Sequence, residues 1–123
     1  RRPPIYTLLP YTTLFRSADG VHLTAHNLMS LAERPTTLVA ASCHDAEQLA
    51  RAMQFELDFA VLGPVHPTAS HPAATAMGWP RFAELARGAS IPVYAIGGLG
   101  RSDLEDAWRA GAHGIAMIRG AWS

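Results

Sequence analysis

The feature that most constrains the fold is a regular alternation of short apolar runs with amphipathic segments. The clearest run is residues 59–62, Phe-Ala-Val-Leu, which ends at Gly63-Pro64. A run without a polar side is typical of a strand that is covered on both faces, as in a parallel sheet. The other strands that we expect are residues 20–23, 38–42, 92–96 and 114–118.

Helical patterns separate these strands. We expect a short helix over 27–33, and a longer one capped by Asp45 with Gln48 at its third position. Another helix precedes the strand at 92–96, and a last one is capped by Ser102 with Glu105 at its third position. The order β-α-β-α-β-loop-α-β-α-β predicts right-handed βαβ units and an α/β fold with parallel strands. The pattern alone leaves open whether the sheet closes into a barrel.

Residues 1–17 differ from the rest of the chain. They contain three of the nine prolines and no acidic residue, and they follow neither a strand period nor a helix period. The string also looks like a translated sequencing adaptor. We therefore interpret 1–17 as a non-native lead, leave it out of the predicted fold, and assign the domain to residues 18–123.

Composition excludes several classes of function. The net charge is zero, and no apolar run approaches the ~20 residues of a membrane span, so we expect neither a nucleic-acid nor a membrane partner. The single cysteine, Cys43, excludes an internal disulfide, and a cytoplasmic location is the default expectation. All ten basic residues are arginine, which excludes lysine Schiff-base chemistry and a Gly-Lys-Ser/Thr phosphate loop.

Candidate site residues follow the predicted strands, because ligands bind at the carboxyl ends of parallel strands. Gly97 and Gly98 could admit a phosphate to backbone N–H groups, or could simply form a tight turn. Arg119 could clamp the same phosphate or be a solvated surface charge. His44 could transfer protons or be a hydrogen-bonded structural histidine, and Cys43 is more easily explained as a buried filler than as a nucleophile.

An ordered set of motifs resembles the thiamine phosphate synthase and thiazole tautomerase family. The resemblance implies a (β/α)8 TIM barrel, of which this chain would hold the C-terminal part, about strands 4–8. A whole barrel needs roughly 250 residues, and this chain has 123. The motifs are residues 19–23, 41–44, 62–68, 91–98 and 110–118.

The resemblance also implies roles for single residues. His44 matches the histidine that moves protons in the tautomerase, which makes it the predicted catalytic residue. The positions that match phosphate- or substrate-binding ones are Ser42, Thr68, Ser70, His71, Gly97, Gly98, Ile118 and Arg119. The expected ligand is therefore a small phosphorylated molecule resembling a thiazole phosphate.

Three departures separate this chain from the synthases. Asn27 stands where the family has the acidic residue that would hold magnesium. The resemblance makes a Mg²⁺ cofactor possible, but its binding would be weaker in this chain. His71 stands where a lysine is usual, and Arg119 where a serine is usual. The departures favour the tautomerase branch, and they also fit a degenerate copy without catalytic activity.

Three functions follow as hypotheses. The first is an enzyme domain of thiamine metabolism that binds a thiazole phosphate. The second is a non-catalytic sensor or interaction domain, of the kind found behind a Nudix hydrolase (8-oxo-dGTP diphosphatase-like) in some bacterial fusions. The third is another sugar-phosphate-type TIM barrel. We expect the chain by itself to be inactive and to fold poorly or self-associate, because half a barrel leaves strand edges open.

Overall fold

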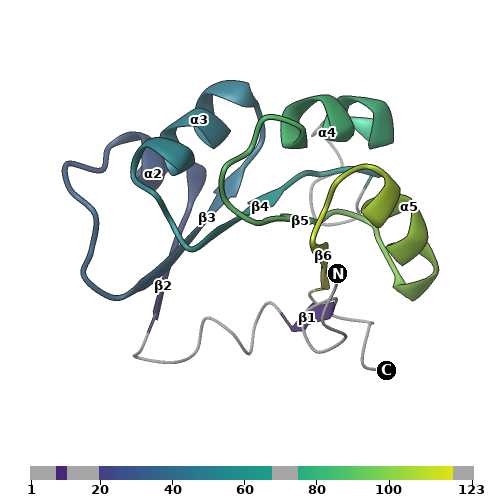
Figure 1. Cartoon of the computed structure of the whole chain (residues 1–123), viewed down its shortest axis with the longest axis horizontal. Coiled ribbons are helices and arrows are strands. Elements are labelled where there is room, and N and C mark those ends of the chain that lie inside the picture. Colours follow the sequence, from purple (N-terminus) through teal and green to yellow (C-terminus); the bar gives the residue numbers. More distant parts are fainter. Residues whose placement is uncertain (1–7, 11–19, 68–74, 118–123) are drawn as a thin grey trace.

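A computed structural model describes residues 8–10, 20–67 and 75–117, and its strands form one parallel sheet (Figure 1). The spatial order of the strands is β1-β6-β5-β4-β3-β2. The strands are β1 (Leu8–Pro10), β2 (Gly20–Leu23), β3 (Leu38–Cys43), β4 (Phe59–Leu62), β5 (Val93–Ala95) and β6 (Gly114–Met117). The helices are α2 (Ala25–Met29), α3 (Ala46–Gln54), α4 (Gly78–Ala86) and α5 (Leu104–Arg109), with a 3-10 turn, η2 (Arg101–Asp103), directly before α5. The predicted alternation and the parallel sheet are confirmed.

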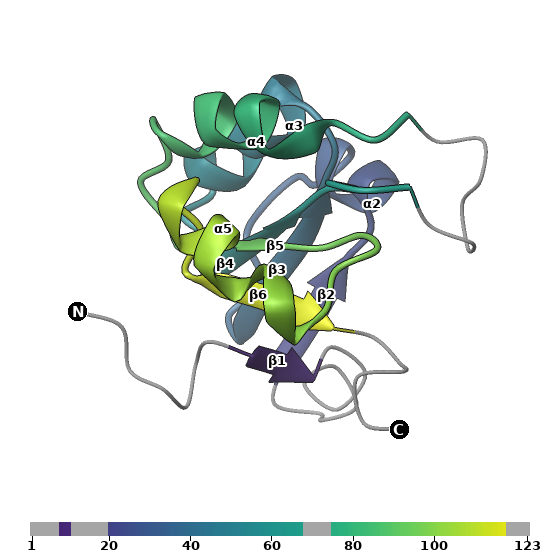
Figure 2. The same cartoon turned by 90° about the vertical axis from the view of Figure 1, so that its right-hand side faces the viewer.

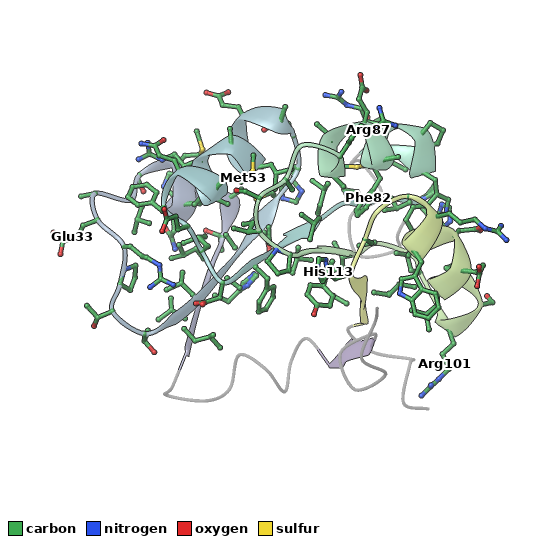
Figure 3. The ribbon with its side chains drawn as sticks, in the orientation of Figure 1. Glu33, Met53, Phe82, Arg87, Arg101 and His113 are labelled. Carbon is green, nitrogen blue, oxygen red and sulfur yellow. The ribbon has the colours of Figure 1, made fainter. Side chains whose placement is uncertain are left out.

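The four α-helices lie on one face of the sheet, and the main core fills the space between the two layers (Figures 1 and 2). Phe82 is fully buried between α4 and the sheet, whereas Arg87 at the end of the same helix points away (Figure 3). The opposite face carries a smaller apolar cluster of Ala40, Phe59, Val61, Tyr94 and Ala116. Along β4, side chains therefore alternate between two apolar environments, which explains why the run at 59–62 contains no polar residue. None of the helices in the described ranges is long and apolar enough to cross a membrane.

Two of the predicted helix starts are wrong. The first helix begins at Ala25 and not at residue 27, because the hydroxyl of Thr24 accepts from the Asn27 amide at 3.1 Å and so caps it. The last helical segment begins at Arg101, ahead of the predicted cap Ser102. There the Asp103 carboxylate accepts from the Gly100 amide at 2.8 Å. The predicted cap Asp45 is confirmed, since its carboxylate accepts from the Gln48 amide at 2.8 Å.

Two arginines hold the connection between α2 and β3 in place. Arg51 on α3 donates to the carbonyl oxygens of Leu28 and Leu31, at 3.2 and 2.7 Å. Arg34 pairs with Asp58 at 2.9 Å, and the same carboxylate accepts from the Val39 amide at 2.7 Å. Each guanidinium group donates to several acceptors at once. A lysine would do this less well, because its three N–H donors all come from one nitrogen atom.

Residues of the lead take part in the sheet. Leu8–Pro10 form β1 and pair with β6 in parallel, with Leu8 opposite Ile115 (Figure 2). Proline lacks an amide hydrogen, and β1 is an edge strand, where such a residue is tolerated. Three residues of the lead thus form an edge strand, and the interpretation of residues 1–17 as a non-native lead stays a prediction.

The loops after β4 and β5 pack tightly against each other. The Val65 amide donates to the Ile96 carbonyl at 2.9 Å, and the His66 amide donates to the Gly97 carbonyl at 3.1 Å. Gly63 has no room for a side chain, because a Cβ there would overlap the carbonyl oxygen of Ile96. Gly63 is thus required for the contact that aligns the two loops.

We predict that Gly63→Ala destabilises the fold. Since the added methyl group must displace backbone, the free energy of unfolding should fall by about 1–3 kcal/mol. Gly88→Ala is the matched control, because no atom lies within 4 Å of a Cβ at that position. Urea unfolding measures both, and equal stabilities of the two variants would show that the loops separate easily.

The turn after α3 contains a strained residue. Glu56 has a φ of 51°, in the left-handed region, and it forms the turn in which the Leu57 amide donates to the Ala52 carbonyl at 3.1 Å. Glycine is the usual residue at this position of a helix end, because it lacks a Cβ.

We predict that Glu56→Gly stabilises the chain by about 0.5–1 kcal/mol, since relief of the left-handed strain exceeds the entropy cost of glycine. Ala50→Gly, at an exposed site within α3, should instead cost about 1 kcal/mol. Thermal melts of both variants compare the two effects. A loss of stability in Glu56→Gly would contradict the assigned strain.

Candidate functional site

The candidate site lies at the carboxyl ends of β3, β4 and β5, which stop at the same level. In the strand register Cys43 pairs with Leu62, and Leu62 pairs with Ala95. The residues that follow the strands, His44, Gly63 and Ile96, are therefore neighbours along one edge of the sheet, which we call the rim. Ligands of parallel α/β sheets bind at this edge.

His44 is held by two hydrogen bonds at the end of β3. Its ring Nδ1 lies 2.8 Å from the carbonyl oxygen of Gly63, and its amide donates to Oε1 of Gln48 at 2.7 Å. Because a carbonyl oxygen can only accept, Nδ1 carries the hydrogen, and in the neutral ring Nε2 keeps its lone pair. The side chain is exposed, so this nitrogen is available for proton transfer with a ligand at the rim.

Ser42 lies one residue before the end of β3, on the face of the sheet away from the helices. Its hydroxyl oxygen is 2.7 Å from Nε2 of His22 on β2. Burial lowers the pKa of His22 to about 4, so this imidazole is neutral at physiological pH. The rim thus contains a hydroxyl group held by an uncharged ring.

Gly97 and Gly98 both have positive φ, of 107° and 64°, at the end of β5. A Cβ on Gly98 would lie 2.6 Å from the carbonyl oxygen of Pro67, so packing against the loop after β4 already requires glycine there. Within the described part of the chain, however, no group accepts a hydrogen bond from the amides of Gly98 and Leu99. These two amides are the backbone donors that could meet an anion.

The described residues offer little for a metal ion. No three His, Cys, Asp or Glu side chains among them lie close enough to hold one. Asn27 is exposed on α2 and offers a neutral amide oxygen, a weaker ligand for magnesium than a carboxylate. Asn27 therefore fits a magnesium ion less well than an acidic residue would, and the weakened magnesium site stays a prediction.

Cys43 is buried, and burial together with the negative charge of Asp45 raises the pKa of its thiol to about 12. The thiol stays protonated at neutral pH, and a protonated thiol is a poor nucleophile. Its side chain belongs to the core between the sheet and the helices, as expected for a buried filler.

The structure brings together four of the predicted site residues, Ser42, His44, Gly97 and Gly98, along the rim. The other predicted phosphate- or substrate-binding residues lie outside the described residues, and their roles stay predictions. They are Thr68, Ser70, His71, Ile118 and Arg119.

Sequence reasoning did not select two histidines near the rim, His22 and His66. His22 contacts Ser42, as described above. His66 lies 3.9 Å from the carboxylate of Asp103, and its ring meets Trp79 edge to face at 5.9 Å. His22 could have been found from the pairing of two neighbouring parallel strands. It is opposite Ala40, so it lies diagonal to Ser42, two residues further along β3. No local pattern relates His66 to Asp103, since loop packing brings them together.

Comparison with known proteins identifies the family. The profile of the family described as thiamine monophosphate synthase matches residues 12–121. The putative thiamine-phosphate synthase 2 of Aquifex aeolicus (strain VF5) is 36% identical over 104 residues, which cover 82% of this chain and 56% of the relative. The putative thiamine-phosphate synthase of Geobacter sulfurreducens is 34% identical over 110 residues, which cover 85% and 52%. The chain thus spans about half the length of these curated relatives.

A solved structure supports the same conclusion. Thiamine phosphate pyrophosphorylase from Pyrococcus furiosus matches with a TM-score of 0.65 and 28% identity, over 82% of this chain and 50% of that one. The parallel sheet is accordingly part of a TIM-barrel-like fold, as the family resemblance implies. Together with the match of the family profile over residues 12–121, this likeness shows that the chain belongs to the thiamine monophosphate synthase family.

Proposed function

We propose that the rim of this chain binds a thiazole phosphate, as part of a barrel that acts in thiamine metabolism. The observation that carries the proposal is the pair of amides at Gly98 and Leu99, which have no acceptor among the described residues. A phosphate oxygen is a strong acceptor, and backbone N–H groups bind it without lysine. The similarity to a putative thiamine-phosphate synthase and to a thiamine phosphate pyrophosphorylase supports a phosphorylated ligand of this class.

The residues that would complete the phosphate site follow neighbouring strands. Thr68, Ser70 and His71 come after β4, and Ile118 and Arg119 come after β6. Hydroxyl and guanidinium groups at these positions would add donors on both sides of the Gly98 amide. In this proposal the phosphate lies across the ends of β4, β5 and β6, and the thiazole ring lies toward His44.

His44 is the proposed general acid and base. With Nδ1–H bonded to Gly63, the lone pair on Nε2 takes a proton from a carbon atom of the thiazole. The same nitrogen then returns the proton to another position, so that the ligand changes tautomer without a net change in charge or composition. The contact between His44 and Gly63 fixes which ring nitrogen does this work.

The phosphate site is tested by a pair of glycine variants. Gly98→Ala should weaken binding of thiazole phosphate at least about tenfold, because a side chain strains the positive φ and displaces the two donor amides. Gly100→Ala should bind as the unchanged protein does, since Gly100 has open space around it and no positive φ. Isothermal titration calorimetry with thiazole phosphate measures both. Absence of saturable binding to the unchanged protein would overturn the proposed function.

The role of His44 is tested by turnover in a full-length protein that carries this sequence. His44→Ala should lower kcat at least about a hundredfold, because it removes the proton-transfer group, while thiazole phosphate still binds. His26→Ala changes another exposed histidine and serves as the control. Unchanged turnover in His44→Ala would remove this residue from the mechanism.

A second function is favoured by Asn27. Replacement of an acidic metal ligand by an amide fits a domain that senses a thiazole phosphate without converting it, for example behind a Nudix hydrolase. Binding of the ligand without turnover in the full-length protein would support this role, and conversion at enzyme-like rates would exclude it. A panel of sugar phosphates in thermal-shift assays separates both roles from a third one, a barrel for another phosphorylated substrate.

A further inference from the structure

The turn that follows β5 carries the two amides of the proposed phosphate site, and it is bonded to the protein at both of its ends. At one end the Gly97 carbonyl accepts from the His66 amide at 3.1 Å. At the other end the Gly100 amide donates to Oδ2 of Asp103 at 2.8 Å, and the Asp103 amide donates back to the Gly100 carbonyl at 2.9 Å. The two donor amides lie between these attachments.

The first attachment sets the direction of one donor. The Gly97 carbonyl and the Gly98 N–H belong to a single peptide group, which is planar and trans. In such a group the N–H bond points opposite to the C=O bond, so the Gly98 hydrogen is directed away from the His66 amide. Gly98 is exposed, so a ligand can reach this hydrogen.

The second attachment restrains the other donor. The Leu99 amide is flanked by Gly98 and Gly100, and glycine permits many backbone angles, so this part of the chain has little intrinsic preference for one conformation. The bond from the Gly100 amide to Asp103 removes much of that freedom, because it fixes the peptide group that directly follows Leu99.

We propose that Asp103 is a positioning residue of the phosphate site, which holds the Gly98 and Leu99 amides in place by accepting from the Gly100 amide. This inference rests on the proposed function, because it assumes that a phosphorylated ligand binds these two amides. Asp103 has no contact with the ligand in this proposal. A carboxylate repels a phosphate, so any favourable effect of Asp103 on binding must come through the turn.

The surroundings of the Asp103 carboxylate reduce that repulsion. Its Oδ2 is bonded to the Gly100 amide, and its Oδ1 faces Nε2 of His66 at 3.9 Å. A protonated His66 ring would form an ion pair with the carboxylate and offset its charge. Trp79 meets the same ring edge to face, with the ring centroids 5.9 Å apart, and helps to keep it beside Asp103.

Asp103→Ala in the full chain tests this role, with thiazole phosphate as the probe. Loss of the acceptor releases the Gly100 amide, and Kd should rise about threefold to tenfold, although the variant removes a negative charge. Asp103→Asn retains an acceptor oxygen and should bind within about twofold of the unchanged protein. If the carboxylate acted only by its charge, both variants would bind more tightly, and that result would overturn the inference.

Two control variants separate this role from general effects of charge and of helix capping. Asp106→Ala removes an acidic residue from the same helix, where its carboxylate lies 3.8 Å from the guanidinium of Arg109. Thr24→Ala removes the cap of α2, which is not part of the turn. Both should leave Kd within about twofold. An equal rise of Kd in Thr24→Ala and Asp103→Ala would reduce the effect to general stability and would overturn the positioning role.

Amide hydrogen exchange of the unchanged protein gives a second test in case Asp103→Ala does not fold. The Gly100 amide should be protected with or without ligand, whereas the Gly98 and Leu99 amides should become protected only when thiazole phosphate binds. Rapid exchange of the Gly100 amide in the free protein would overturn the inference alone. Absence of saturable binding to the unchanged protein would instead overturn the proposed function, and the inference with it.

Discussion

The close packing of the loops after β4 and β5 is the constraint on which the rest of the rim depends. Gly63 meets Ile96, and Gly98 meets Pro67, at distances that exclude any side chain. Two backbone hydrogen bonds, from Val65 and His66, hold the loops in this arrangement. Because the loops are joined in this way, the Gly63 carbonyl is fixed where the His44 ring can bind it, and Gly98 is fixed against Pro67.

The two faces of the sheet differ, because one contributes to the main core and the other carries polar residues near the rim. The core between the sheet and the helices holds most of the large buried side chains, including Phe82 of α4, Leu49 of α3 and Ile115 of β6. On the other face, the smaller apolar cluster is continued at β2 and β3 by the polar pair His22 and Ser42. A polar pair is costly in a core unless its members bond to each other, and the 2.7 Å contact offsets that cost. The polar group can then lie near the rim without weakening the main core.

Much of the fold could be predicted because its strands are buried on both faces. The runs at 59–62 and 38–42 contain few polar residues, so each could be recognised as a strand from its own sequence. The structure confirms both strands. Helix starts were less predictable where neighbouring residues can both supply a capping acceptor. Ser102 was the predicted cap, but the carboxylate of Asp103 accepts from the Gly100 amide. The rim was predictable only in outline. The glycines at 97 and 98 suggested an anion site, yet their first physical cause is contact with a loop more than thirty residues earlier, which no local pattern reveals.

The absence of lysine gives the arginines and the backbone distinct roles. Arg34 and Arg51 are committed to carbonyl and carboxylate groups around the α2–β3 connection, and Arg81 and Arg109 pair with acids on their own helices. None of these four lies at the rim, so within the described residues they add no cation to it. Among the described groups, the amides of Gly98 and Leu99 are the neutral donors that would hold an anionic ligand there. Neutral donors depend on geometry more than charges do, since a hydrogen bond weakens steeply with angle whereas a Coulomb attraction does not. The close packing of Gly97 and Gly98 against the loop after β4 is therefore what would hold these amides in position.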